Sequence, residues 1–207
     1  MVGRTPVRAR PPVALFLRAS GRPSPQEMEL EQLLNQVPEY AKDLKLNLGG
    51  VTRQTELTEQ QTWGTAVACA IAARNPQLLE SLLPEAARHL NEQAMFAAKA
   101  AAAVMGMNNI FYRFRHLSSN EKYSSMPARL RMQVIGKHGS DPVDFELWCL
   151  AVSAINGCGV CVDAHERVLR DKGVNEETIL AAVRIASTIH ALAAIFDAEP
   201  ALSAATA

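Results

Sequence analysis

The sequence predicts an all-α protein built from two similar helical units in one chain. Alanine is abundant and aromatic residues make up only 5% of the 207 residues, a composition that favours closely packed helices over a sheet. An internal repeat agrees with this: Trp63-Gly-Thr-Ala-Val-Ala resembles Trp148-Cys-Leu-Ala-Val-Ser, and Asn91-Glu92 recurs as Asn175-Glu176 at nearly the same offset along the chain. A repeat of this kind indicates one structural design used twice.

Residues 1–27 differ in composition from the rest. They are rich in proline and hold five arginines but one acidic residue, Glu27. We expect a disordered basic N-terminal extension, or a start placed too early with Met28 as the natural first residue; a transit peptide is the alternative. The predicted organisation is this extension (1–27) and one all-helical domain (28–207), whose repeat halves cover about 28–112 and 141–200.

Charge and hydropathy exclude several classes of protein. The formal net charge is +0, but residues 28–207 hold four more acidic than basic side chains, and nucleic-acid binding needs a basic surface. The mean hydropathy of −0.02 is typical of an ordinary soluble domain. Apolar stretches such as 93–107 are too short to cross a bilayer. We therefore expect a cytoplasmic protein without a transmembrane helix that binds neither a membrane nor nucleic acid.

Helical periodicity and capping signals divide the domain into helices. Thr58 and Gln61 match a capping box, in which each side chain accepts a hydrogen bond from the other residue's backbone N–H. Asn91, Asp144 and Asn175 are good residues for capping the start of a helix. The expected helices cover about residues 28–36, 38–48, 59–74, 78–89, 92–107, 145–155, 158–169 and 176–196.

Residues 108–143 are the least regular part of the sequence. Asn108-Asn109 comes directly after the alanine-rich helix, and several glycines and prolines follow. We expect this segment to connect the two units. Its aromatic and basic residues, 111–115, either pack the connection, as such residues more often do, or line a surface for a partner.

The reactive residues are concentrated in one short stretch, Asn156-Gly157-Cys158-Gly159-Val160-Cys161, with His165 four residues further on. Asn-Gly permits a sharp break, which places Cys158 at a helix start, where free N–H groups favour a thiolate. Cys158, Cys161 and His165 then share one helical face. The corresponding part of the first repeat has no cysteine, so the thiols belong to the second unit alone. Two other cysteines, Cys69 and Cys149, lie among apolar residues and are expected to be inert.

Glu146 is a candidate fourth member of the site. If the helices before and after Asn156-Gly157 pack antiparallel, Glu146 lies about 15 Å from the turn and His165 about 11 Å from it, at nearly the same level. Glu146 can then orient His165 and relay protons. If the two helices continue in line, Glu146 is too far away and only complements the helix dipole.

Zinc binding is the chief alternative use of the cysteine pair. Cys158, Cys161, His165 and one further ligand could form a tetrahedral site. Structural zinc usually draws on a second nearby cysteine pair, which this chain lacks. No strand is expected before the motif, so a thioredoxin fold does not fit.

Three separated motifs lie in order along about residues 28–196. They are Pro38-Glu39-Tyr40-Ala41-Lys42-Asp43 with Lys45-Leu46-Asn47-Leu48, Met105-Gly106-Met107-Asn108-Asn109-Ile110-Phe111-Tyr112-Arg113, and Phe145-Glu146-Leu147-Trp148 leading to Cys158-x-x-Cys161-x-x-x-His165-Glu166. Together they closely resemble the alkyl hydroperoxidase D family. The resemblance implies an all-helical fold shared with carboxymuconolactone decarboxylases and a homotrimer.

The resemblance also implies an activity and a role for each site residue. It implies an antioxidant thiol peroxidase in which Cys161 attacks the hydroperoxide and passes through a sulfenic acid. Cys158 would be the proton donor and resolving thiol, forming the Cys158–Cys161 disulfide, and Glu146 and His165 would relay protons. One departure stands out: well-known members carry histidine where this chain has Val160, which puts in doubt a second imidazole near the thiols.

The same resemblance implies the electron donor and the partners. Dihydrolipoamide, on a lipoyl-bearing acyltransferase, would reduce the disulfide, with no tightly bound cofactor and no metal. A 2-Cys peroxiredoxin of the alkyl hydroperoxide reductase C type would be regenerated through a transient interchain disulfide at Cys161. The alternatives are an interaction protein stabilised by zinc or switched by redox, and a non-redox decarboxylase-type enzyme, which has no use for two adjacent thiols.

Overall fold

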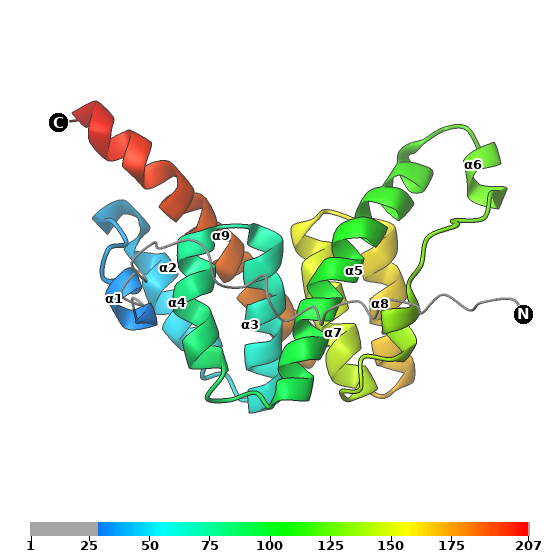
Figure 1. The fold of residues 1–207 in the computed structure, drawn as a ribbon, viewed down its shortest axis with the longest axis horizontal. Coiled ribbons are helices and arrows are strands. Elements are labelled where there is room, and N and C mark those ends of the chain that lie inside the picture. The colour runs from blue at the N-terminus through cyan, green and yellow to red at the C-terminus, as the bar shows by residue number, and fades with distance from the viewer. Residues whose placement is uncertain (1–28, 207) are drawn as a thin grey trace, which may run out of the picture.

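A computed structural model describes residues 29–206, which form helices joined by mostly short connections; the exception is the long segment between α6 and α7 (Figure 1). No strand occurs in this part of the chain, and the prediction of an all-α fold is confirmed. The expected basic extension, residues 1–27, and the proposed start at Met28 lie outside the described residues. The elements are α1 (Leu30–Leu34), η1 (Glu39–Ala41), α2 (Lys42–Val51), α3 (Glu59–Ala73), α4 (Pro76–Ala86), α5 (Glu92–Leu117), α6 (Lys122–Ser125), η2 (Gln133–Gly136), α7 (Pro142–Ile155), α8 (Gly159–Asp171) and α9 (Glu176–Thr206).

The centre of the protein is the contact between α3 and α7, with α5 and α9 packed around both. Trp148 on α7 is fully buried against Gly64 on α3. A Cβ at Gly64 would lie 2.3 Å from the indole ring, so only glycine permits this close approach. The indole Nε1 donates to the carbonyl of Gln61 at 3.3 Å. This joint holds α7, and with it the cysteine-bearing turn, against the first unit.

Three helices of the second unit follow the same order as three of the first. α3, α4 and α5 begin at residues 59, 76 and 92, and α7, α8 and α9 begin at residues 142, 159 and 176. Thr58 caps α3 through the expected capping box with Gln61. Asn91 caps α5, and its side-chain oxygen accepts from the Ala94 N–H at 2.8 Å. The exact boundaries of the repeat halves stay a prediction.

The long helix α5 does not end near Met107. It continues through Asn108-Asn109 to Leu117, so the prediction of an irregular segment is wrong for residues 108–117. Residues 118–141, which hold only the short α6 and η2, are irregular as predicted. Asparagine is a poor helix former in isolation because its side chain competes for backbone hydrogen bonds. Here the Asn109 side chain binds Ser153 on α7 instead, which removes that competition. The extra turns of α5 therefore lie beside the cysteine-bearing turn.

Two further helix boundaries differ from expectation. Asp141, not Asp144, caps α7: its carboxylate accepts from the N–H groups of Val143 at 2.7 Å and Asp144 at 3.3 Å, and Pro142 occupies the first helical position. Asp144 is buried in the first turn and accepts from the side-chain amides of two α3 glutamines. At the other end of the chain, α9 runs on through Pro200 to Thr206.

The last helix, α9, is both long and apolar. By length and composition alone it could cross a membrane, which was not expected from the sequence. Its most apolar window is 56% buried inside the protein, where it packs against α2, α3 and α7. This is the burial of a core helix.

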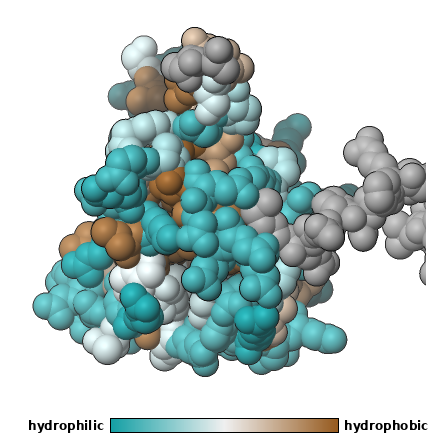
Figure 2. Space-filling view, turned by 90° about the vertical axis from the view of Figure 1, so that its left-hand side faces the viewer, coloured by the Kyte–Doolittle hydropathy of each residue, from teal (hydrophilic) through white to brown (hydrophobic). Residues whose placement is uncertain are grey.

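The face at the left of Figure 1 is mostly hydrophilic with small apolar patches (Figure 2).

Candidate functional site

The cysteine-bearing turn joins α7 to α8 and has the hydrogen bonds of a Schellman motif. Gly157 takes the left-handed conformation, with φ of +64°, and its N–H donates to Ala154 O at 3.1 Å. The N–H of Cys158 donates to Ser153 O at 3.1 Å. Cys158 is also the N-cap residue of α8, as the sequence predicts. One residue therefore ends α7 and begins α8.

Side chains from α5 brace this turn. Asn109 is fully buried; its amide nitrogen donates to Ser153 Oγ and its oxygen accepts from Asn156 Nδ2, both at 2.9 Å. The Arg113 guanidinium donates to the carbonyl of Asn156. Sequence reasoning missed these contacts because it ended the helix at residue 107. The Met105–Arg113 motif of the resembled family was the one sequence feature that pointed to these α5 side chains.

The two cysteines of the motif are bonded to each other. The Cys158–Cys161 bond has an S–S distance of 2.09 Å and a Cα–Cα distance of 5.3 Å. Cys158 is 0% exposed, whereas Cys161 is 7% exposed. The pocket described below is lined by Cys161 and not by Cys158, so Cys161 is the more accessible of the two residues.

The structure brings Glu146 and His165 together. Helices α7 and α8 pack antiparallel, and the Glu146 Oε2 atom lies 2.7 Å from His165 Nδ1. The geometric prediction is confirmed, and Glu146 does not merely complement the dipole of α7. The side chains of Glu146 and His165 are 20% and 17% exposed, so their contact is only weakly screened by solvent.

The Nε2 edge of the His165 ring determines how the Glu146–His165 pair can accept and donate a proton. Its Nε2 lies 3.3 Å from the Met105 sulfur, a weak acceptor that offers no proton. When Glu146 accepts a hydrogen bond from the Nδ1–H group, the lone pair of Nε2 is free to accept a proton. The pair can thus store and release a proton at Nε2.

A pocket of about 230 Å³ lies directly beside Cys161 and His165. Most of its wall is apolar. Val160, at the position where the sequence departs from the resembled family, is part of this wall, so the departure makes the pocket more apolar. The lining residues are Met105, Asn108 and Tyr112 from α5, Ile135 from η2, and Val160, Cys161, Ala164 and His165 from α8.

An imidazole that the sequence reasoning did not consider lies near Glu146. His138 is buried and stacks on Phe145, with ring centroids 4.0 Å apart, and its Nδ1 accepts from Ser140 N–H at 3.2 Å. Burial lowers the pKa of His138, while the charges of Glu146 and Asp141 oppose this shift. The lowered pKa favours the neutral form of the His138 ring.

The other two cysteines lie in the core, as predicted. Cys69 and Cys149 are 0% and 1% exposed. Burial raises the pKa of both thiols, and the charge of Glu146 adds to the shift at Cys149. A thiol held protonated is a poor nucleophile. Neither buried thiol is therefore suited to nucleophilic attack.

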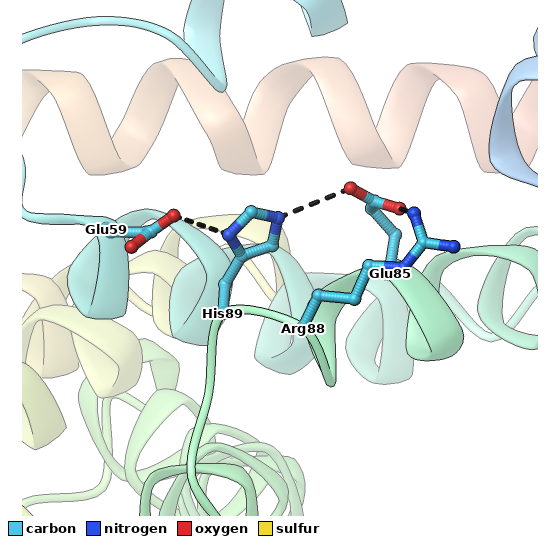
Figure 3. Close-up of polar contacts among 4 residues, drawn as sticks. All are labelled: Glu59, Glu85, Arg88 and His89. Carbon is cyan, nitrogen blue, oxygen red and sulfur yellow. Dashed lines mark hydrogen bonds and ion pairs between the residues drawn. The ribbon is translucent and has the colours of Figure 1, made fainter.

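The first unit has an ion-pair cluster at the end of its α3–α4 helix pair that lies away from the α3–α4 turn (Figure 3). His89 lies between two carboxylates: its Nδ1 is 2.5 Å from Glu59, and its Nε2 is 3.3 Å from Glu85, which also binds Arg88 at 2.7 Å. The His89 ring stacks on Trp63 at 4.5 Å. These contacts tie the start of α3 to the end of α4 and include no nucleophile.

No three His, Cys, Asp or Glu side chains in the described part of the chain are grouped as metal ligands would be. In this oxidised form, Cys158 and Cys161 bond each other and His165 turns towards Glu146. The zinc set of Cys158, Cys161 and His165 stays an alternative for the reduced protein.

Known proteins share this sequence over most of its length. A protein named alkyl hydroperoxide reductase AhpD from Solibacter usitatus is 84% identical over 172 residues, which are 83% of this chain and 97% of the relative. The chain belongs to the AhpD family. Family members from Acidobacterium capsulatum and Streptomyces griseus are 62% and 56% identical and are covered over 94% and 99% of their lengths. The carboxymuconolactone decarboxylase family matches residues 121–204, which include the whole turn. The family resemblance noted in the sequence is confirmed.

Proposed function

We propose that the protein is an alkyl hydroperoxide reductase that uses Cys158 and Cys161 as a dithiol/disulfide couple. The overall reaction converts two thiols and one hydroperoxide into a disulfide, an alcohol and water. The observation that carries this proposal is the Cys158–Cys161 bond beside the Glu146–His165 pair, with a pocket opening at Cys161. The names of the similar family members support the same reaction class.

Exposure divides the roles of the two cysteines. Cys161 is the more accessible sulfur, so its thiolate attacks the terminal oxygen of the hydroperoxide. The O–O bond breaks, Cys161 becomes a sulfenic acid, and the alkoxide leaves. His165 supplies the proton that converts the alkoxide into an alcohol, and Glu146 stabilises the imidazolium before transfer. The buried Cys158 thiol then attacks the sulfenic acid sulfur, which forms the disulfide and releases water.

The disulfide is reduced by dithiol exchange at Cys161. We propose dihydrolipoamide on a lipoyl-bearing acyltransferase as the electron donor; one of its thiolates attacks Cys161 Sγ and its second thiol closes the lipoamide ring. Regeneration of a 2-Cys peroxiredoxin uses the same atom, through a transient interchain disulfide at Cys161. The pocket at Cys161 supports both steps, since Cys158 is closed to solvent.

A homotrimer in the cytoplasm completes the proposal. Apolar side chains are exposed along the outer part of α5 and on the α6 segment, the arm at the upper right of Figure 1. Contiguous exposed apolar residues are typical of a protein interface. The side chains are Ile110, Phe114, Leu117, Tyr123 and Met126. Light scattering of the purified protein measures the oligomer directly.

Peroxide consumption driven by dihydrolipoamide tests the function. The native protein should reduce an organic hydroperoxide with turnover, and Cys158→Ser and Cys161→Ser should each abolish it. Absence of turnover in the native protein, with or without a peroxiredoxin, would refute the proposal. Zinc analysis of the reduced protein separates the zinc-stabilised alternative, since stoichiometric zinc contradicts a peroxidase. A decarboxylase would keep its activity in both serine variants.

A further inference from the structure

Two consecutive asparagines of α5 have opposite hydrogen-bonding states. Asn109 is fully satisfied by Ser153 and Asn156. Asn108 is 5% exposed. Its side-chain oxygen is the one buried side-chain nitrogen or oxygen atom within residues 29–205 that lacks a hydrogen-bond partner. Unsatisfied buried polar atoms are rare in native proteins and call for an explanation.

The position of Asn108 suggests that explanation. Its side chain lines the 230 Å³ pocket together with Cys161 and His165. The remaining wall is apolar apart from the Tyr112 phenol, so Asn108 places an amide in a mostly apolar pocket beside the reactive sulfur. The Asn108 oxygen has almost no accessible surface, so the side chain must rotate before a ligand can reach it. A polar group that costs stability in the wall of a pocket is typical of a residue that a ligand completes.

The chemistry of a hydroperoxide matches that of a primary amide. A hydroperoxide R–O–O–H offers one O–H donor and, on the adjacent oxygen, an acceptor. A primary amide offers a carbonyl acceptor and N–H donors a short distance apart. Neither a simple alkane chain nor a thioether would satisfy the Asn108 oxygen.

We propose that Asn108 binds the hydroperoxide group and orients it for attack by Cys161. This inference rests on the function proposed above. Rotation of the Asn108 amide turns its buried oxygen to the pocket. The hydroperoxide O–H then donates to Asn108 Oδ1, and an Asn108 N–H donates to the oxygen that bears the alkyl group. Cys161 thiolate attacks the terminal oxygen and the O–O bond breaks, so negative charge develops on the second oxygen, beside the amide N–H. His165 then protonates this alkoxide, and the O–H that Asn108 held remains on the Cys161 sulfenic acid.

Asn108→Leu tests the inference by separating the two half-reactions. Reduced protein is mixed with cumene hydroperoxide, quenched with an alkylating agent and analysed for the disulfide by mass spectrometry. We expect the variant to form the disulfide about 10- to 100-fold more slowly than the native protein. The oxidised variant should be reduced by dihydrolipoamide within about 3-fold of the native rate, since thiols form only weak hydrogen bonds.

Thermal stability provides the second measurement. Replacing an unsatisfied amide by an apolar side chain should raise the melting temperature, by about 2–4 °C. Asn109→Leu is the matched control: it breaks a satisfied network and should lower the melting temperature. A slower oxidation together with a higher melting temperature is not the result of a structural defect.

Three outcomes would overturn the inference. An unchanged oxidation rate in Asn108→Leu shows that the amide does not bind the hydroperoxide. Equal slowing of both half-reactions shows that Asn108 only shapes the pocket, and a lower melting temperature shows that it supports the fold. Failure of the native protein to form any disulfide with cumene hydroperoxide would instead refute the proposed function itself, and the inference with it.

Discussion

Replacing Glu146 by glutamine tests the proton relay most directly. Glutamine keeps the size of the side chain and removes the carboxylate that lies 2.7 Å from His165 Nδ1. If the new amide nitrogen faces the ring, it donates to Nδ1 and forces the imidazole proton onto Nε2, towards Met105. That tautomer can no longer accept a proton at Nε2.

The size of the effect follows from the contact that is lost. A hydrogen bond to a charged group contributes about 1.5–3 kcal/mol, and both side chains are mostly buried, so little of it is screened. A barrier change of about 1.4 kcal/mol corresponds to a tenfold change in rate. The Glu146→Gln variant should therefore reduce hydroperoxide about 10- to 100-fold more slowly than the native protein.

The assay is a single turnover of the reduced protein with excess cumene hydroperoxide, followed by the loss of free thiol. Glu166→Gln is the matched control, because Glu166 is a more exposed carboxylate on α8 that pairs loosely with Arg170 at 4.0 Å. It should retain the native rate within about 2-fold. A rate for Glu146→Gln within about 3-fold of native, or an equal loss in the control, would show that no relay runs through Glu146.

Three other variants probe the thiols, the core and the buried imidazole. With Cys158→Ser, the remaining thiol at Cys161 should react with an aromatic disulfide reagent at least about 10-fold faster than the thiol left in Cys161→Ser; equal rates would contradict the assigned roles. Gly64→Ala should lower the free energy of unfolding by about 1–2 kcal/mol, because overpacking against the buried tryptophan costs more than the gain in helix propensity. Gly106→Ala has open space around the new methyl group and should not lower it. Denaturant titration measures both free energies, and equal values would contradict the overpacking. Since burial lowers the pKa of His138, the unfolded state binds its proton first, and stability should fall as the pH drops below the ordinary histidine value of about 6.5. His138→Gln should show a shallower fall in melting temperature between pH 7 and 5, and an unchanged slope would refute the assignment.

The sequence predicts the central pair of the site because local rules determine it. The Asn156-Gly157 pair marks a chain reversal, and the helical rise then sets the level of every residue on the two antiparallel helices. Glu146 and His165 come to the same level for this reason alone. The Schellman turn around Gly157 and the placement of Cys158 at the start of α8 follow from the same short stretch.

The α5 side of the site was not predictable in the same way. Asn108-Asn109 is a weak sequence for a helix interior, and its helical state depends on Asn109 binding a residue 44 positions away. Such contacts are decided by tertiary packing. The same applies to Asp141, which caps α7 in place of the expected Asp144, since Asp144 is needed to bind the glutamines of α3.

The cysteine-bearing turn between α7 and α8 has a consequence for repeated turnover. The peptide groups of Cys158 are fixed on both sides: its N–H binds Ser153, and its carbonyl accepts from the N–H groups of Cys161 and Val162. None of these bonds involves a sulfur atom. In the proposed cycle, breaking the S–S bond therefore removes none of the backbone hydrogen bonds that end α7 and begin α8. We expect the two helices to keep their hydrogen bonds while the cysteine side chains rotate between the oxidised and reduced forms.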